Sequence, residues 1–474
     1  MTVLVSFAKQ NIAEFTRAVF YMKKLWDKGQ TKLDPIIEAF ETGDDLLLDQ
    51  KLIPYDIVAS VSHAMMLGKI GILTKKEVEQ LQKGLIEIQK LYDNGKFTLE
   101  MGDEDMHTKI ERYLTDKKGE VGEKIHTGRS RNDQVLTAIR LFCKAELLEI
   151  QILLLDLAES FAKAAKKHEF VAMPGYTHMQ QAMPSSVGMW VGSFAESLLD
   201  DLASLKSAYM LNNQSPLGSG AGYGVPLNLD REYSAKLLGF EKVQNNSLYV
   251  QNSRGKIEAS ILASLVSVLQ TINRFSNDVL LFTTQEFKHL NVSDHLISGS
   301  SIMPQKKNID VAELLRSKLH LVLGYYMQVV SLSSNLISGY NRDYQDSKNP
   351  LLASLSIVKQ SLLVSKVLLD NIEINTNALK QSLNPKLYAT HAAMDLVKEG
   401  IPFRKAYKTV KNNLSALDLQ NDEKILHQST HSGGTGNLGL QKLFKNIQLE
   451  QKLVKKEQLS WKKTVKSLLG GEKK

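Results

Sequence analysis

Residues 129–173 read RSRNDQVLTAIRLFCKAELLEIQILLLDLAESFAKAAKKHEFVAM and contain no glycine or proline. Because these two residues most often end helices, so long a run without them predicts one long helix. Apolar residues recur in it at three- and four-residue spacing, at Leu141, Ala145, Leu148, Ile152, Leu155 and Ala162. Further leucines and isoleucines widen this face beyond a single stripe, so the helix needs several neighbours, as in a helical bundle.

Other parts of the chain share this pattern. Residues 193–214, 256–298 and 351–384 also lack both glycine and proline, and residues 309–338 contain only Gly324. Strand signals are sparse, and the glycine-rich residues 215–226 predict an irregular loop. The expected fold class is therefore all-α, with long helices in a central bundle.

The pattern predicts three domains. Residues 1–128 contain shorter helical pieces, residues 129–381 hold the long helices, and residues 382–474 read as a small helical domain punctuated by glycines. Residues 1–21 lack the unbroken apolar core and the small-residue cleavage site of a secretory signal. We expect them to be a short helical extension or an upstream start.

The composition is that of an ordinary globular protein. The 474 residues are 43% hydrophobic and 23% charged, which is typical of soluble chains. Cys143 is the single cysteine, so no disulfide can form within the chain, and a cytoplasmic location is expected. The net charge is +8, but basic residues form no aromatic-interleaved stripe, so nucleic acid is not an expected partner.

Several classes of function find no support in the sequence. No apolar run is long enough to cross a membrane, so no membrane partner is expected. No Walker sequence, dinucleotide fingerprint, EF-hand loop or zinc-ligand spacing is present. We expect no cofactor and no metal, and Cys143 is expected to fill the core. Side chains must then carry any chemistry.

Residues 299–308 read GSSIMPQKKN and concentrate groups suited to a carboxylated substrate. They supply a hydroxyl at Ser300, a cation at Lys306 and an amide at Asn308. The Gly-Ser-Ser start is flexible enough to close over a ligand. The segment resembles the signature of the fumarase/aspartase superfamily, GSS-x-MP-x-K-x-N, at every fixed position.

A second motif, residues 124–135, reads KIHTGRSRNDQV and opens the long helix. Arginines at a helix N-terminus suit carboxylate binding. The same residues also read as a capping cluster, with Ser130 and Asp133 as caps and the arginines in solvent. Spacing alone leaves the two readings equal. The string resembles the HTGRSRNDQV hallmark of the argininosuccinate lyase family, and this resemblance favours substrate binding by Arg131 and Asn132.

A third stretch, residues 173–180, reads MPGYTHMQ and matches the GYTH-x-Q pattern of the same family. A lone histidine is more often structural, but the resemblance indicates Thr177 and His178 as site residues. In the family a glutamate, here Glu313, pairs with this histidine and orients its ring, as carboxylates commonly do. Without the resemblance Glu313 would read as a carboxylate on a helix surface.

A fourth stretch, residues 340–348, reads YNRDYQDSK. Its spacing matches the substrate-binding run of argininosuccinate lyases, with Tyr340, Gln345 and Lys348 as the matching positions. Residues 103–107, DEDMH, also resemble an acidic helix start of the family, although helix capping explains their acids equally well.

The resemblance implies a β-elimination that splits argininosuccinate into L-arginine and fumarate, without a cofactor. It implies Ser300 as the base, Lys306 as a cation that stabilises the dianion formed next, and His178 with Glu313 for proton handling. The implied substrate-binding residues are Arg131, Asn132, Thr177, Asn308, Tyr340, Gln345 and Lys348. It also implies an all-α, three-domain lyase whose central bundles form the core of a homotetramer, with each active site shared between subunits.

The sequence departs from the family pattern near its start. An early substrate-contacting serine of the family falls on Asp45, and the family's Trp-Gly-Gly-Arg-Phe is replaced by WDKGQ at residues 26–30. These departures concern substrate contacts more than the chemistry. Two other functions remain open: another lyase of the superfamily, and a structural lens protein built on the same fold with weak or no activity.

Overall fold

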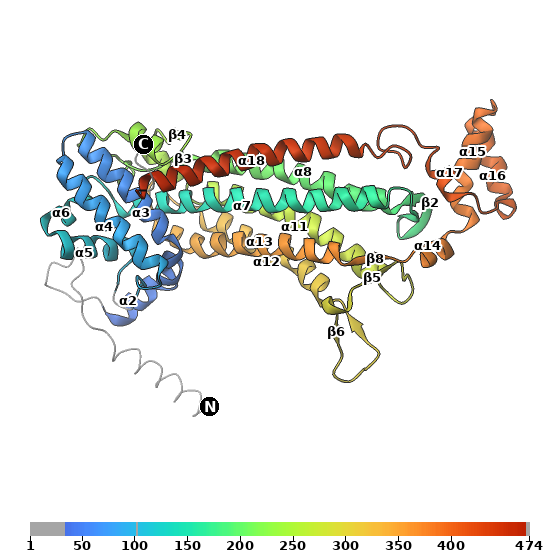
Figure 1. The fold of residues 1–474 in the computed structure, drawn as a ribbon, viewed down its shortest axis with the longest axis horizontal. Coiled ribbons are helices and arrows are strands. Elements are labelled where there is room, and N and C mark those ends of the chain that lie inside the picture. The colour runs from blue at the N-terminus through green and yellow to red at the C-terminus, as the bar shows by residue number, and fades with distance from the viewer. Residues whose placement is uncertain (1–33, 101–102, 471–474) are drawn as a thin grey trace.

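Long helices run side by side along an elongated molecule (Figure 1). The computed structural model describes residues 34–100 and 103–470. The central helices are α7 (Arg131–Lys167), α8 (Val187–Asn212), α11 (Lys256–Phe282), α12 (Asp310–Leu332) and α13 (Lys348–Asp370). Each overlaps a stretch predicted to be helical because it contains no glycine or proline or, for α12, only Gly324, so the all-α prediction is confirmed.

The helix α7 is 37 residues long and begins at a capping box. The Ser130 hydroxyl accepts a hydrogen bond from the N–H of Asn132, and the Asp133 carboxylate accepts one from the N–H of Ser130. These contacts satisfy N–H groups that a helix start otherwise leaves without partners. The capping reading of Ser130 and Asp133 is therefore correct.

Aromatic rings pack three helices of the bundle against one another. Phe161 of α7, Phe194 of α8 and Phe275 of α11 are buried, and their ring centroids lie 5.0 to 5.5 Å apart. Tilted and edge-on packing of this kind is favourable beyond the area that it buries. Cys143 is also buried in α7, as expected of a core residue, and burial raises the pKa of its thiol.

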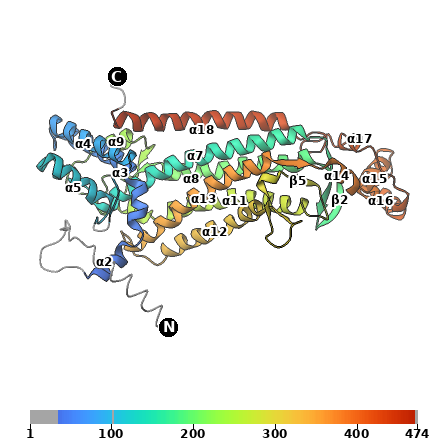
Figure 2. The same cartoon turned by 60° about the horizontal axis from the view of Figure 1, so that its bottom comes forward.

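Other helices, most of them shorter, form the two ends of the molecule (Figure 2). At one end lie α2 (Pro35–Thr42), α3 (Asp45–Lys69), α4 (Lys75–Asp93), α5 (Met106–Lys118), α6 (Glu120–Glu123), η1 (Lys124–His126), α9 (Arg231–Leu237) and α10 (Ser247–Asn252). At the other lie α14 (Thr376–Ser382), η4 (Pro385–Tyr388), α15 (Ala389–Lys398), α16 (Phe403–Asn412), η5 (Leu414–Ala416) and α17 (Asp422–Leu426).

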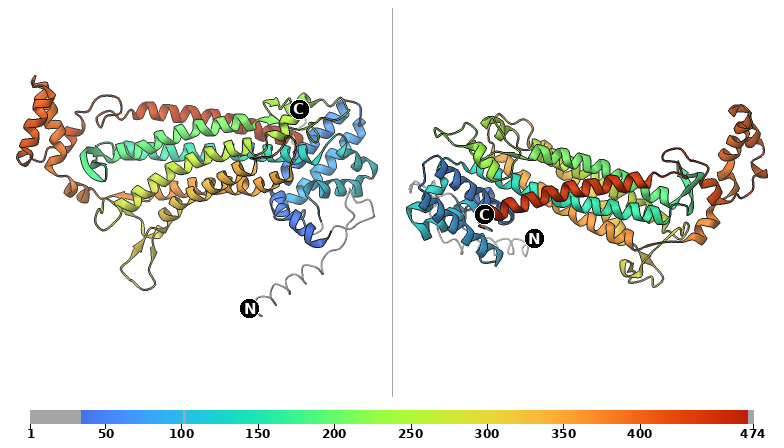
Figure 3. Two further views of the ribbon diagram at one scale, coloured as in Figure 1. Left: turned by 180° about the vertical axis from the view of Figure 1, so that it is seen from behind. Right: turned by 45° about the horizontal axis from the view of Figure 1, so that its top comes forward.

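The last helix, α18 (Leu440–Leu468), returns along α7 to the end where the N-terminal helices lie (Figure 3). There the Gln82 amide donates a hydrogen bond to the Leu468 carbonyl at 3.0 Å. Residues 382–474 therefore contain a long helix that packs on the bundle, a feature that the predicted domain division did not include. The boundaries after residues 128 and 381 stay a prediction.

A buried lysine of the bundle contacts α18. The Lys144 ammonium on α7 donates to the Asn213 amide oxygen at 2.8 Å and lies 5.7 Å from the centroid of the Trp461 ring of α18. Tyr209 of α8 donates its hydroxyl proton to Glu457 of α18 at 2.7 Å. Burial lowers the pKa of Lys144 to about 8.

Short strands form two-stranded pairs between the helices. They are β1 (Ala172–Thr177) with β2 (Gln180–Ser186), β3 (Gln214–Ser215) with β4 (Lys242–Val243), β5 (Leu290–Val292) with β8 (Ile372–Ile374), and β6 (Ser298–Gly299) with β7 (Lys307–Asn308). Two short 3₁₀ helices, η2 (Asp294–Leu296) and η3 (Arg342–Ser347), complete the described elements.

The hairpin of β1 and β2 was not predicted, because its Pro-Gly sequence reads as a turn. In the structure the register shifts between Pro174 and Tyr176, and Gly175 lies at that irregularity. A β-carbon at Gly175 would lie 3.0 Å from the Met183 carbonyl oxygen, so glycine allows this close approach.

Two helical segments, Ser247–Phe282 and Arg342–Asp370, are long and apolar enough to cross a membrane by length and composition alone. In their most apolar windows 61% and 50% of the residues are buried inside the protein. Core helices of a bundle have the same properties. The extension expected at residues 1–21 and the departure at residues 26–30 lie outside the described residues.

Candidate active site

A charged cleft of about 300 Å³ opens where α3, α7, η3 and α13 approach one another. Five of the residues predicted to bind substrate line it: Arg131, Asn132, Tyr340, Gln345 and Lys348. Its remaining lining residues are Glu41, Thr42, Asp45, Asp49, Glu104, Asp105, His107, Val135, Arg254 and Arg342. The structure thus brings two motifs that are far apart in the sequence to one place.

Lys348 is the buried cation of this cleft. Its ammonium lies 2.7 Å from an Asp49 carboxylate oxygen and 3.0 Å from one of Asp45. Burial opposes the charge of Lys348, but the two carboxylates outweigh it, so the pKa of Lys348 is raised. Burial also raises the pKa of Asp45, the residue that replaces the family serine. This end of the cleft holds two carboxylates around one ammonium.

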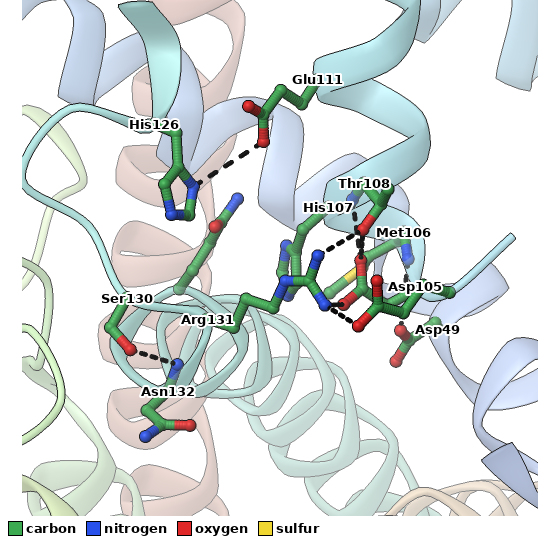
Figure 4. Close-up of polar contacts among 12 residues, drawn as sticks. Asp49, Asp105, Met106, His107, Thr108, Glu111, His126, Ser130, Arg131 and Asn132 are labelled. Carbon is green, nitrogen blue, oxygen red and sulfur yellow. Dashed lines mark hydrogen bonds and ion pairs between the residues drawn. The ribbon is translucent and has the colours of Figure 1, made fainter. Parts of the chain in front are cut away.

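Arg131 is held by the start of α5 (Figure 4). Its guanidinium forms ion pairs with Glu104 and, at 3.2 Å, with Asp105, and it donates to the Thr108 hydroxyl at 2.8 Å. The Asp105 carboxylate also accepts the Thr108 N–H, which caps α5. The acids of residues 103–107 therefore cap a helix, as the capping interpretation predicts, and they also hold Arg131, a contact that the sequence did not predict.

A buried ion pair supports the cleft from behind. His107 lies 3.1 Å from the Asp56 carboxylate, which also accepts a hydrogen bond from the Gln134 amide at 3.2 Å. Burial opposes a charge on His107, but Asp56 outweighs it, so the pKa of His107 is raised. His107 is thereby fixed beside Asp105 at the wall of the cleft.

Aromatic and amide groups close the opposite side. The Arg254 guanidinium lies over the Tyr340 ring, 4.9 Å from its centroid, which is a cation–π geometry. The Gln345 amide donates to the Glu41 carbonyl at 2.8 Å, and Arg342 pairs with the Glu41 carboxylate at 3.2 Å. Contacts with α2 therefore fix η3, which carries Gln345.

Sequence reasoning missed Asp49, Arg254 and Glu41. A signal for Asp49 existed: it lies four residues after Asp45, so both face the same side of a helix, within an otherwise apolar stretch. Arg254 lies in none of the four motifs that the sequence offered. Nothing in the sequence near Glu41 indicated a site.

Ser300 lies on an arm formed by β6, β7 and the loop between them, which projects from the bundle (Figure 1). The Ser300 hydroxyl oxygen accepts hydrogen bonds from the N–H groups of Ile302 at 3.3 Å and Met303 at 3.0 Å. Lys306 and Asn308 follow on the same arm. The side chain of Ile302 is 82% exposed.

The two lysines of the arm differ in their partners. The Lys307 ammonium forms an ion pair with Asp294 at 2.7 Å, outside the body of the protein. Lys306 is exposed and donates its backbone N–H to the Met303 carbonyl, and its ammonium has no ion pair or hydrogen bond with any residue that the structure describes. The lysine that the superfamily pattern fixes is therefore the one whose side chain is available for a ligand.

His178 and Thr177 lie at the tip of the β1–β2 hairpin, where both are exposed. Glu313 is exposed in the first turn of α12, where it lines a second depression with Asn273, Asn277, Leu314, Arg316, Ser317 and His320. Within the residues that the structure describes, no ion pair or hydrogen bond joins Glu313 to His178. One chain thus presents the predicted site residues in separate places: the cleft, the arm, the hairpin tip and α12.

Comparison with known proteins gives matches over most of the chain. A family model described as lyase matches residues 28–324. The argininosuccinate lyase of Thermotoga neapolitana is 45% identical over 388 residues, which cover 82% of this chain and 97% of that protein. The argininosuccinate lyase of Phocaeicola vulgatus is 40% identical over 416 residues, which cover 88% of this chain and 93% of that protein.

Solved structures share the fold at lower identity. The structure of EDDS lyase in complex with formate has a TM-score of 0.75 at 19% identity and covers 93% of this chain and 97% of its own. Class II fumarase from Schistosoma mansoni has a TM-score of 0.67 at 17% identity, covering 82% of this chain and 94% of its own. At these identities the likeness concerns the fold alone.

Proposed function

The chain belongs to the argininosuccinate lyase family of the fumarase/aspartase superfamily, and we propose that its cleft, arm and hairpin tip together form the active site. The protein is a carbon–nitrogen lyase that splits argininosuccinate reversibly into L-arginine and fumarate, a reaction of arginine biosynthesis. The observation that carries the site is the meeting of residues 131–132 and 340–348 in one cleft.

The charges of the cleft suit this substrate. Argininosuccinate carries carboxylates at both ends, a cationic guanidino group and an ammonium group. Arg131 and Lys348 can bind its carboxylates, because fixed cations hold such groups strongly. Asp45 and Asp49 lie beside Lys348 and can bind its cationic part. Hydrogen bonds to the substrate come from Tyr340, Gln345 and Asn132. Further substrate contacts come from Thr177 on the hairpin and Asn308 on the arm.

Ser300 is the base in this proposal. It removes the proton from the carbon next to a succinyl carboxylate, which builds negative charge on that carboxylate. The C–N bond to the guanidino nitrogen then breaks, its electron pair leaves with the nitrogen, and the carbanion pair forms the double bond of fumarate. Serine is a weak base, so its alkoxide needs stabilisation. The N–H groups of Ile302 and Met303 already point at its oxygen.

Lys306 and Asn308 stabilise the doubly charged carboxylate formed after proton removal, because preorganised cations and donors act most strongly where charge develops. His178 supplies a proton to the leaving nitrogen. Glu313 orients the His178 ring once both reach the same site. No step in this scheme needs a cofactor or a metal.

The protein is proposed to be a homotetramer with shared sites. The proposed catalytic residues lie apart in one chain, and copies of the chain can supply the missing segments to one another. The helix α12 buries only Ala312, Leu315, Val322 and Val329. Leu314, Leu321 and Met327 on it are at least 50% exposed, and apolar surface of this kind is typical of an interface. A cytoplasmic location is proposed alongside.

The function is tested by following fumarate absorbance after addition of argininosuccinate. Turnover of argininosuccinate, with none of malate or aspartate, is the expected result. Malate or aspartate turnover would assign another reaction of the superfamily. A folded, inactive protein with every substrate would favour a structural role.

A further inference from the structure

The turn that carries His178 has a backbone conformation that its residues do not favour. His178 and Met179 have φ values of 51° and 60°, a region where a β-carbon crowds the following carbonyl oxygen. Two-residue hairpin turns with two positive φ values normally contain Asn-Gly or Gly-Gly. Met179 is 72% exposed, so packing around the turn does not hold it. Such conformations persist only when neighbouring structure fixes them.

Gln181 ties this hairpin to the C-terminal region. It pairs with Tyr176 across the hairpin, one pair away from the turn. Its amide is used at both ends: the nitrogen donates to the Ser382 carbonyl at 2.9 Å, and the oxygen accepts from the Asn384 amide at 2.5 Å. An amide group bonded through both its oxygen and its nitrogen cannot rotate without losing a contact.

The residue that holds Gln181 is itself fixed. Asn384 caps η4, and at the end of η4 the buried Tyr388 donates its hydroxyl proton to Asp422 of α17 at 2.5 Å. Just after α17, His427 stacks on Phe170, with ring centroids 4.1 Å apart. Phe170 lies two residues before β1. Residues 382–427 therefore hold the hairpin both at its base and beside its turn.

We propose that Gln181 and Asn384 are positioning residues, which hold the His178 turn in its strained conformation and so aim the imidazole at the substrate. This inference rests on the catalytic role given to His178 in the proposed function. It extends the site to the C-terminal region. Gln181 and Asn384 lie at the surface. If they had no positioning role, replacing either of them would change neither the fold nor the rate.

The test uses the full-length protein with Gln181→Ala, Asn384→Ala and both together. If the His178 imidazole is no longer held in position, kcat should fall about tenfold while KM stays near its original value, because a small misplacement of a catalytic group lowers the rate strongly. Gln181→Ala removes both contacts of the Gln181 amide, including the one that Asn384→Ala removes, so the double variant should be no slower than Gln181→Ala alone. Ser382→Ala is the matched control: it keeps the carbonyl that accepts from Gln181, and it should turn over normally.

A second set of variants distinguishes failure of this inference from failure of the proposed function. In the His178→Asn background, adding Gln181→Ala should cause no further loss, because the two residues act through one group. A further tenfold loss there, or a normal kcat for Gln181→Ala, would overturn the positioning role. Normal turnover by His178→Asn itself would instead overturn the catalytic role of His178.

If Gln181→Ala fails to fold, Gln181→Glu keeps the oxygen that accepts from Asn384 and removes only the donor to the Ser382 carbonyl. Its kcat should fall between those of the original protein and Asn384→Ala. Normal turnover by both Gln181→Glu and Asn384→Ala would reject the proposal.

Discussion

The oxygen of Ser300 already receives two backbone N–H groups, from Ile302 and Met303. These donors stabilise an alkoxide more than a hydroxyl, so the loop lowers the free-energy cost of ionising the serine, which must lose its proton before it can act as the base. Elsewhere such contacts would be an ordinary turn. Here they lie on the projecting arm that also carries Lys306.

Ser300→Ala is expected to abolish turnover and leave the fold intact, because it removes one hydroxyl from a loop outside the core. The measurement is kcat for fumarate release, with circular dichroism to check folding. Ser301→Ala, which removes the neighbouring hydroxyl, serves as the control and should keep most of its activity. Near-normal turnover by folded Ser300→Ala would exclude this residue as the base.

Lys306→Met should cost about 3 kcal/mol or more in transition-state stabilisation, as loss of other preorganised donors does. Lys307→Met should cost less, since the Lys307 ammonium is already engaged in an ion pair with Asp294 at 2.7 Å. Comparing kcat/KM of the two variants is decisive. Equal losses would contradict the assignment of Lys306 to the dianion.

At the level of elements, the helices of the bundle follow directly from the sequence. Residues 129–173 predicted α7 because they lack glycine and proline, and the Ser130–Asp133 caps fixed its start. The β1–β2 hairpin was not predicted, because its Pro-Gly sequence reads as a turn and its contact with Ser382 joins residues far apart in the sequence. The cleft residues were predicted from motifs, but Arg254 and Glu41 enter it only through packing of distant helices.

The attachment of α18 gives a pH dependence. The pKa of Lys144 is lowered to about 8 in the folded protein, below the ordinary value of about 10.4. Between these values the unfolded chain binds more protons at this position than the folded one, so stability rises with pH. Unfolding of the original protein and of Lys144→Met is compared from about pH 8 to about pH 10.

The Tm of the original protein should rise relative to that of Lys144→Met across this range, because the variant has no proton to lose there. Glu457→Gln offers a second comparison, since it removes a charge near Lys144 without removing the amine. A constant difference in Tm between the original protein and Lys144→Met would mean that Lys144 does not titrate in this window.

At the scale of the whole molecule, one chain spreads its proposed catalytic groups over distant places. Arg131 and Lys348 lie in the cleft at one end, whereas the His178 hairpin lies at the other end, near α14 (Figure 1). An elongated bundle can bring such groups together only by placing several copies side by side. Closed symmetric assemblies do this, because every copy donates the same segments.

Mixing two inactive variants tests this arrangement. His178→Asn and Lys306→Met place lesions on the hairpin and on the arm, so dissociating and re-associating a mixture should create some sites without either lesion. Random mixing predicts recovery of about a quarter of the sites at most. Native mass spectrometry must confirm mixed tetramers. Mixed tetramers as inactive as either parent would mean that each site belongs to one chain.

The return of α18 along the bundle also bears on how the protein is made. Its buried Ile447, Val454 and Trp461 cover apolar surface on helices that leave the ribosome much earlier. That surface stays uncovered until α18 has been translated, a period when nascent chains aggregate or recruit chaperones. A premature stop before Leu440 therefore yields a chain that contains all the central helices but leaves their apolar surface exposed and prone to aggregation. Quality control should remove such products even though no proposed catalytic residue is missing.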